Sequence, residues 1–197
     1  MNMAATRAFA WTRPGCIARP TMMQSHSPWT GRPIVLVGLM GVGKSTVGRR
    51  LAVRLAVPFV DADHEIESAA DMSITEIFAE YGEPYFRDGE RRVIARLIDG
   101  TPKVIATGGG AFINDETRSL ILAEATAIWL SAPPEILVER VGRRNTRPLL
   151  RNRDAGQVLA ELARVRNPIY AKAHIHIASN KAPHEATVAS ILKAIGL

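Results

Sequence analysis

One glycine-rich segment constrains the fold of this chain more than any other: Gly38-Leu-Met-Gly-Val-Gly-Lys-Ser45. The apolar residues 34–37 precede it, and a helix-like stretch at residues 46–55 follows it. A strand, a loop and a helix in this order bring consecutive backbone N–H groups and a helix N-terminus around one anion, because glycines lack the Cβ atoms that would block close approach. The segment therefore predicts an α/β fold that binds the phosphates of a nucleoside triphosphate.

The lysine and serine of this loop have separate predicted roles. Lys44 is expected to neutralise the β- and γ-phosphates, and the Ser45 hydroxyl is expected to be one oxygen ligand of a magnesium ion. The residues predicted to hold the nucleotide at the loop are Gly41, Val42, Gly43, Lys44, Ser45 and Thr46.

Composition and charge exclude several classes of function. The 197 residues, 47% hydrophobic and 22% charged, are typical of a single globular domain. The net charge of +6 falls to +2 from residue 34 onward (21 basic minus 19 acidic residues), so we expect no nucleic-acid partner. One cysteine excludes an internal disulfide framework, and no apolar run is long enough for a membrane span.

Residues 1–30 differ from the rest of the sequence. They contain no Asp or Glu, carry several prolines and show no apolar periodicity, which predicts a disordered extension. An acid-free, arginine-containing segment also fits an organelle transit peptide, a bacterial tail, or a true start at Met22 or Met23. We expect a cytoplasmic protein, with organelle targeting as the alternative.

The remaining sequence alternates short apolar runs with helical patterns, which predicts a parallel sheet with helices on both faces, a three-layer α/β/α domain over residues 31–197. A helical insertion is expected at about 62–98 and a mobile lid at about 142–153. The predicted strands are residues 34–37, 58–60, 103–106, 127–130 and 174–177, and the predicted helices are 46–55, 65–70, 73–81, 85–98, 114–124, 135–141, 154 or 156 to 165, and 184–195.

Two carboxylates follow the second predicted strand. Asp61 and Asp63 are alternate residues, so on an extended strand end their side chains share a face. Beside a phosphate loop, Asp61 would hold magnesium through water, and Asp63 would orient and deprotonate an attacking hydroxyl. The alternative for Asp63 is a helix N-cap, which is compatible with the first role.

Arg87 lies near the start of a predicted helix, where a cation opposes the helix dipole. A guanidinium in that position suits an anionic substrate group bound through two hydrogen bonds. The alternative is a salt bridge to Glu83, Asp88 or Glu90.

Other basic and glycine-rich positions point to the same ligands. The run from Gly108 through Gly109 to Gly110 offers backbone N–H groups to an oxygen-rich ligand at a strand end. Arg166 lies near a predicted helix end, where the helix dipole alone would explain it. Six arginines crowd one region, which predicts a lid that closes on a polyphosphate: Arg140, Arg143, Arg144, Arg147, Arg151 and Arg153.

Together these segments resemble the shikimate kinase family over about residues 33–178. The resemblance is carried by Gly-Leu-Met-Gly-Val-Gly-Lys-Ser-Thr46, Asp61-Ala-Asp63, Ser73-Ile-Thr-Glu-Ile-Phe78, Gly82-Glu-Pro-Tyr-Phe-Arg87, Thr107-Gly-Gly-Gly110, Arg147-Pro-Leu-Leu150 and Arg166-Asn-Pro-Ile-Tyr170.

This resemblance implies a nucleoside-monophosphate-kinase-like fold with strand order 2-3-1-4-5, and transfer of the γ-phosphoryl group of ATP to the 3-hydroxyl of shikimate. It also implies aromatic amino-acid (chorismate) biosynthesis, one Mg²⁺ per subunit and a monomer. By similarity, Asp63, Lys44 and Arg147 are catalytic, with Arg147 in the lid bridging the phosphates and the acceptor. Arg87 and Arg166 would hold the substrate carboxylate, Gly108 to Gly110 would line the substrate, and Arg140 would pack on adenine.

Three other functions compete with this one. A gluconate kinase also phosphorylates a polyhydroxylated carboxylate, a nucleoside monophosphate kinase would need an acceptor pocket for a phosphate and a base, and a regulatory module would bind nucleotide without turnover. The complete motif set favours shikimate as the acceptor.

Overall fold

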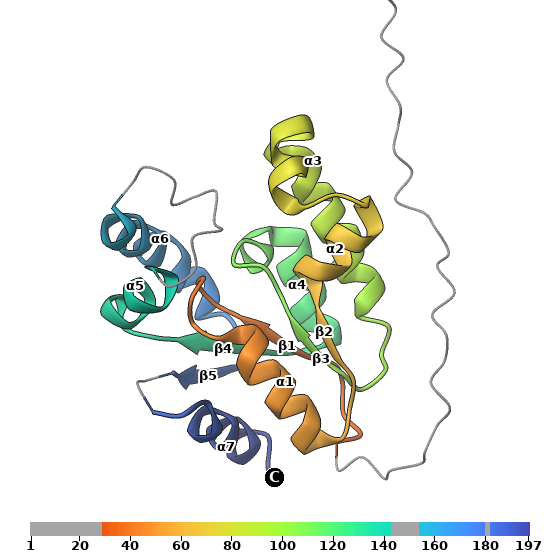
Figure 1. The fold of residues 1–197 in the computed structure, drawn as a ribbon. Coiled ribbons are helices and arrows are strands. Elements are labelled where there is room, and N and C mark those ends of the chain that lie inside the picture. The colour runs from red at the N-terminus through yellow and green to blue at the C-terminus, as the bar shows by residue number, and fades with distance from the viewer. Residues whose placement is uncertain (1–28, 143–153, 180–181) are drawn as a thin grey trace, which may run out of the picture.

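A computed structural model describes residues 29–142, 154–179 and 182–197. Its centre is a five-stranded parallel sheet with the order β2-β3-β1-β4-β5, which confirms the predicted strand order (Figure 1). The strands are β1 (Ile34–Val37), β2 (Phe59–Asp61), β3 (Val104–Ala106), β4 (Thr126–Ser131) and β5 (Ile175–Ala178). All four residues of β1 are fully buried, as expected for a central strand that is covered on both faces.

Helices cover both faces of the sheet. Helices α1 and α7 pack together below the strands in Figure 1, and α4 and α6 lie on the opposite side. The helices are α1 (Lys44–Leu55), α2 (Ala62–Ala70), α3 (Ile74–Leu97), α4 (Asp115–Glu124), α5 (Pro134–Gly142), α6 (Ala155–Tyr170) and α7 (His184–Ala194), with a 3₁₀ turn η1 at Ala111–Ile113. In the described ranges no helix has the length and apolar character needed to cross a membrane.

The start of α2 corrects the prediction for the aspartate pair. Asp61 is the N-cap of α2, and its carboxylate accepts a hydrogen bond from the backbone N–H of Asp63 at 3.2 Å. The helix therefore begins directly at the strand end, and Asp63 lies in its first turn. Asp61 is extended, as predicted, whereas the extended geometry predicted for Asp63 is wrong. The alternative that Asp63 is the cap is also wrong, because Asp61 is the N-cap.

Helix α3 confirms the predicted break near residue 82. Gly82 adopts φ 80° and ψ 173° inside the element, so two helical segments meet there at a kink. A positive φ of this kind is open to glycine because it has no Cβ. The predicted capping box at the start of α3 is also present, with Ser73 and Glu76 each accepting a hydrogen bond from the other's backbone. In Figure 1, α2 and α3 pack together beside the sheet, within the predicted insertion.

Helix α6 continues five residues beyond its predicted end, to Tyr170. Pro168 lies in the last turn of this helix and donates no backbone hydrogen bond there. Arg166 is consequently an interior residue of the helix, outside its last turn. The helix dipole therefore does not account for this arginine, because the dipole acts within the last turn only.

Candidate active site

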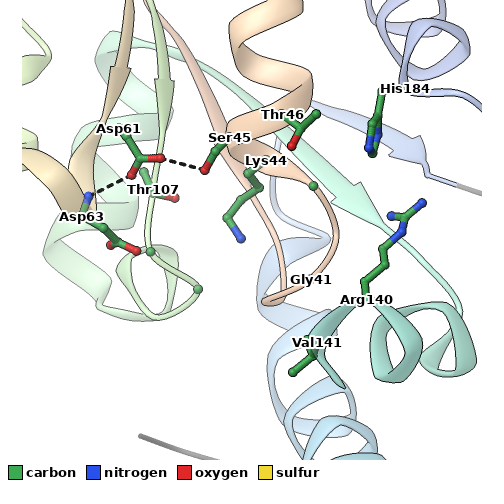
Figure 2. A pocket seen from close by; sticks show the side chains of 13 residues that line it. Gly41, Lys44, Ser45, Thr46, Asp61, Asp63, Thr107, Arg140, Val141 and His184 are labelled. Carbon is green, nitrogen blue, oxygen red and sulfur yellow. Dashed lines mark hydrogen bonds between the residues drawn. The ribbon is translucent and has the colours of Figure 1, made fainter. Parts of the chain in front are cut away.

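A cavity of about 340 Å³ opens at the carboxyl ends of the central strands, next to the phosphate loop. Open α/β sheets bind ligands at this edge. Its lining combines loop residues with residues of α1, β2, α2, α5 and α7: Gly41, Gly43, Lys44, Ser45, Thr46, Asp61, Asp63, Thr107, Gly108, Gly109, Arg140, Val141 and His184. Most of the residues predicted for nucleotide and acceptor binding are thus brought to one cavity (Figure 2).

The phosphate loop depends on left-handed backbone at its glycines. Gly43 adopts φ 100° immediately before α1, and Gly38 adopts φ 136° with no room for a Cβ beside the Leu130 carbonyl. Lys44, which follows Gly43, folds back so that its Nζ donates hydrogen bonds to the carbonyl oxygens of Gly38 (2.8 Å) and Leu39 (3.0 Å). The loop therefore presents an ammonium group and a helix N-terminus at one place, which suits a polyphosphate.

Ser45 and Asp61 form a pair beside the loop. The Ser45 hydroxyl donates to Oδ2 of Asp61 at 2.7 Å, as Figure 2 shows. A hydroxyl and a carboxylate are the hard oxygen donors that Mg²⁺ prefers, so the pair fits the predicted metal. Within the described ranges, no group of three or more His, Cys, Asp or Glu residues could hold a metal ion. Phosphate and water oxygens would therefore complete the coordination, as is usual for Mg²⁺.

Two carboxylates converge on Gly108 at the acceptor side of the cavity. A Cβ placed on this glycine would lie 2.8 Å from Oδ1 of Asp63 and 2.8 Å from Oε1 of Glu90. The Glu90 side chain is only 3% exposed, and its Oε1 has no hydrogen-bond partner in the part of the chain that the structure describes. Burial raises the pKa of Glu90, Arg87 opposes this shift, and the Asp63 charge adds to it.

Arg87 is held by two glutamates. Its Nη1 donates to Oε2 of Glu90 at 2.7 Å, while Nε and Nη2 both donate to Oε1 of Glu83, at 3.1 and 2.9 Å. The predicted salt bridges to Glu83 and Glu90 are therefore present, whereas Asp88 pairs with other arginines. The face of the Arg87 guanidinium packs so closely against Gly110 that a Cβ there would collide with it.

Arg166 reaches the same glycine run from α6. Its Nη1 donates to the carbonyl oxygen of Gly109 at 3.1 Å, and the Tyr170 hydroxyl donates to the same oxygen. Burial raises the pKa of Tyr170 to about 12, so this group remains a neutral donor. Two guanidinium groups from different helices thus flank three glycines, an arrangement that can bind a carboxylate through charge-assisted hydrogen bonds.

Arg140 lies at the other side of the phosphate loop. Its Nη1 donates to the carbonyl oxygen of Val42 at 3.3 Å and to the hydroxyl of Ser179 at 3.4 Å. Ser179 is buried and also donates to Val42, at 3.3 Å. The predicted nucleotide-binding arginine is therefore anchored to the loop itself. Arg147 and the predicted lid residues 143–153 lie outside the described residues.

Three residues at or beside the site were missed by sequence reasoning. Glu90 was identified only as one possible partner of Arg87. Its position three residues further along the same helix could have indicated this ion pair. Tyr170 stood inside a quoted motif without a role. His184 was assigned only to the start of the last helix, and nothing near it in sequence indicated a nucleotide.

The glycine-rich loop between β1 and α1, the parallel sheet and the cavity beside the loop define a kinase of the P-loop class. Comparison with known proteins narrows this class. The family model described as shikimate kinase matches residues 40–196. The chain belongs to the shikimate kinase family, and is accordingly an enzyme that uses ATP as co-substrate.

Individual relatives agree with this assignment. A shikimate kinase of Caulobacter vibrioides is 58% identical over 169 residues, covering 86% of this chain and 84% of the relative. One from Novosphingobium aromaticivorans is 59% identical over 170 residues, covering 84% and 88%. The solved structure of a shikimate kinase from Acinetobacter baumannii in complex with shikimate has a TM-score of 0.81 at 38% identity, covering 84% of this chain and 93% of that one.

Proposed function

We propose that this chain transfers the γ-phosphoryl group of ATP to the 3-hydroxyl of shikimate, giving shikimate 3-phosphate for chorismate and aromatic amino-acid biosynthesis. The observation that carries this proposal is the pair of guanidinium groups, Arg87 and Arg166, that meet at the glycine run beside Asp63. A small acceptor with both a carboxylate and hydroxyl groups matches this arrangement. The close family relatives support the same acceptor.

The acceptor carboxylate would bind between Arg87 and Arg166. A guanidinium has five N–H donors, and only three of those on Arg87 are used by Glu83 and Glu90. One N–H remains on each terminal nitrogen, which can face a carboxylate. Gly108, Gly109 and Gly110 would line the ring of the substrate, since a side chain at two of these positions would strike Asp63 or Arg87.

Asp63 would orient the acceptor hydroxyl and take its proton. In the transfer step the hydroxyl oxygen forms a bond to the γ-phosphorus while the bond from that phosphorus to the β,γ-bridging oxygen breaks. The hydroxyl proton passes to the Asp63 carboxylate, and ADP leaves with the electron pair. Because the transition state is loose, orientation by Asp63 would contribute at least as much as its basicity.

The phosphate side would stabilise the charge that develops. Gly41, Val42 and Gly43 would contribute the loop backbone, with Thr46 at the start of α1. Lys44 and Arg147 would neutralise the transferring group. One Mg²⁺ per subunit, held at Ser45 and Asp61 and by the phosphates, supplies charge neutralisation at the β- and γ-oxygens when bound.

The remaining expectations belong to the same proposal. We infer a monomer that acts on small molecules, with no nucleic acid or membrane as partner. The net charge of +2 from residue 34 onward supports the absence of a nucleic-acid role. A cytoplasmic location is proposed on the basis of the bacterial relatives.

The decisive experiment is a coupled assay of ADP release with ATP and Mg²⁺. Shikimate, gluconate, AMP and no acceptor are compared at equal concentration, with Lys44→Ala as the control for turnover at the phosphate loop. Turnover with shikimate alone is the expected result. Turnover with gluconate or AMP would reassign the acceptor pocket, and ATP binding without turnover would favour a regulatory function.

A further inference from the structure

Tyr170, the last residue of α6, is a fully buried tyrosine that lies against two other aromatic rings. Its ring stacks on Phe112 of η1, with 6.4 Å between the ring centroids, and on Trp129 of β4, with 6.1 Å. A phenylalanine would fill the same space against these two rings. Packing in the core therefore accounts for the ring of Tyr170 and leaves its hydroxyl to be explained.

The hydroxyl of Tyr170 is directed at the acceptor side. It donates a hydrogen bond to the carbonyl oxygen of Gly109, which also accepts one from Nη1 of Arg166 at 3.1 Å. Arg166 and Tyr170 are four residues apart, so their side chains lie on one face of α6. A carbonyl oxygen has two lone pairs, and these two donors use both of them.

The Tyr170 oxygen also interacts with Arg166 itself. Burial raises the pKa of this hydroxyl, whereas the charge of the Arg166 guanidinium and a hydrogen bond from it lower the pKa. The hydroxyl thus accepts from Arg166 and donates to Gly109. A buried hydroxyl needs such partners, because leaving it unpaired costs free energy. The guanidinium of Arg166 is consequently held at two oxygens, one from Tyr170 and one from Gly109.

Such contacts matter because the glycine run is a flexible support for a binding site. Gly108, Gly109 and Gly110 have no side chains that could fix their backbone, and glycine loses more conformational freedom on ordering than any other residue. Hydrogen bonds from α6 to the central carbonyl restrict this freedom. An arginine side chain is flexible as well, so contacts that hold its guanidinium in advance reduce the entropy lost when a ligand binds.

We propose that Tyr170 is a positioning residue for the acceptor carboxylate, and that its hydroxyl holds the Arg166 guanidinium against Gly109 in the geometry that binds the substrate. Because Tyr170 is fully buried, it acts through Arg166 and does not touch the substrate. This inference rests on the proposed function, in which Arg166 binds the carboxylate of shikimate.

The test is Tyr170→Phe, which removes one oxygen atom and keeps the ring against Phe112 and Trp129. The KM for shikimate should rise about 5-fold, the effect of one neutral hydrogen bond, while kcat and the KM for ATP should change less than about twofold. A hydroxyl with a structural role alone would lower the melting temperature and leave the KM for shikimate unchanged. Tyr81→Phe removes the same atom from an exposed residue of α3 and is the matched control, which should keep all three constants.

A double-mutant cycle tests whether the hydroxyl acts through Arg166. In an Arg166→Ala background, Tyr170→Phe should raise the KM for shikimate less than about twofold, because the guanidinium that the hydroxyl positions is already absent. Melting temperatures of the single and double variants show that each one is folded under the assay conditions.

Three outcomes would overturn the proposal. An unchanged KM for shikimate in Tyr170→Phe would leave the hydroxyl a structural role only. A further 5-fold rise in the Arg166→Ala background would mean that the hydroxyl does not act through Arg166. Equal rises in the KM for shikimate and for ATP would mean that it acts on the whole glycine run, which lies beside Met40 of the phosphate loop. Absence of turnover with shikimate in the unaltered protein is a different result, because it would overturn the proposed function and this inference with it.

Discussion

The two sides of the cavity are built in different ways. The phosphate side comes mostly from one continuous segment, Gly38 to Thr46, which acts through its backbone and a single lysine. The acceptor side combines Asp63, Gly108 and Gly109, which line the cavity, with side chains of α3 and α6 that pack against the glycine run. One side is therefore a local structure, whereas the other exists only when distant elements pack.

The two sides also handle charge differently. Lys44 donates two hydrogen bonds to backbone carbonyl oxygens of its own loop. Arg87, in contrast, is fixed between Glu83 and the buried Glu90. Paired charges thus fix the position of the Arg87 side chain at the acceptor site. Removing one member of this network would leave the others without a partner. Variants on the two sides should consequently fail in different ways.

The largest difference between the effect on turnover and the effect on ATP affinity is expected for Asp63→Asn. This change removes the proton acceptor while leaving the phosphate loop intact, so kcat should fall about 10³-fold with little change in ATP affinity. Steady-state kinetics and ADP calorimetry measure the two effects. Asp71→Asn, at the exposed C-cap of α2, is the matched control and should keep full activity. Retention of activity in Asp63→Asn would remove Asp63 from its proposed role.

The next effect concerns the carboxylate site. Arg166→Ala should raise the KM for shikimate about 30-fold, because one charge-assisted contact is lost, and should change the KM for ATP less than about twofold. Arg164→Ala, an exposed neighbour on α6, should change neither constant. Equal increases in both KM values would place Arg166 on the phosphate side and contradict its assignment to the acceptor side.

Substitutions at Gly110 and Gly109 test whether a steric clash with Arg87 impairs substrate binding. An Ala at position 110 would collide with the Arg87 guanidinium, so Gly110→Ala should raise the KM for shikimate about tenfold. At Gly109 the nearest atoms to a new Cβ are 3.6 Å away, so Gly109→Ala should have a smaller effect. The KM values of both variants test this order, and a reversed order would contradict the packing described for Arg87.

Glu90→Gln should change how stability depends on pH. Burial raises the folded-state pKa of Glu90 above its usual 4.5, so ionising it in the folded protein is unfavourable. The wild type therefore loses stability as pH rises from about 4.5 through the folded pKa, and the Gln variant lacks this loss. The melting temperature of Glu90→Gln relative to wild type should rise over that range. A difference in melting temperature that does not change with pH is expected for the exposed control Glu124→Gln. The same result for Glu90→Gln would contradict the raised pKa of Glu90.

The smallest effect is expected far from the acceptor side. Arg50 and Glu185 form an ion pair between α1 and α7, but their side chains are 44% and 66% exposed. Solvent screens such pairs, so Arg50→Ala should shift the melting temperature by only about 1 °C. A thermal melt measures this shift, and one above about 5 °C would show that the α1 and α7 contact depends on charge more than on its buried apolar residues.

The sequence by itself determined the phosphate side and the order of elements. A loop with fixed glycine spacing, apolar runs and capping residues such as Ser73 and Asn114 act within a few residues of one another, so their outcome is local. The strand order followed from resemblance to a family, and the structure confirmed it. The sequence did not determine every end of these elements, because α2 begins earlier and α6 ends later than predicted.

Only the tertiary structure decided which side chains meet. The hydrogen bond from Ser45 to Asp61 joins two elements, Arg166 donates a hydrogen bond to Gly109, 57 positions away in the sequence, and Glu90 lies beside Asp63 and Gly108. His184 reaches Gly43 from the last helix. Local pattern cannot specify such contacts, because they depend on how helices pack on the sheet and on which buried charges find partners there.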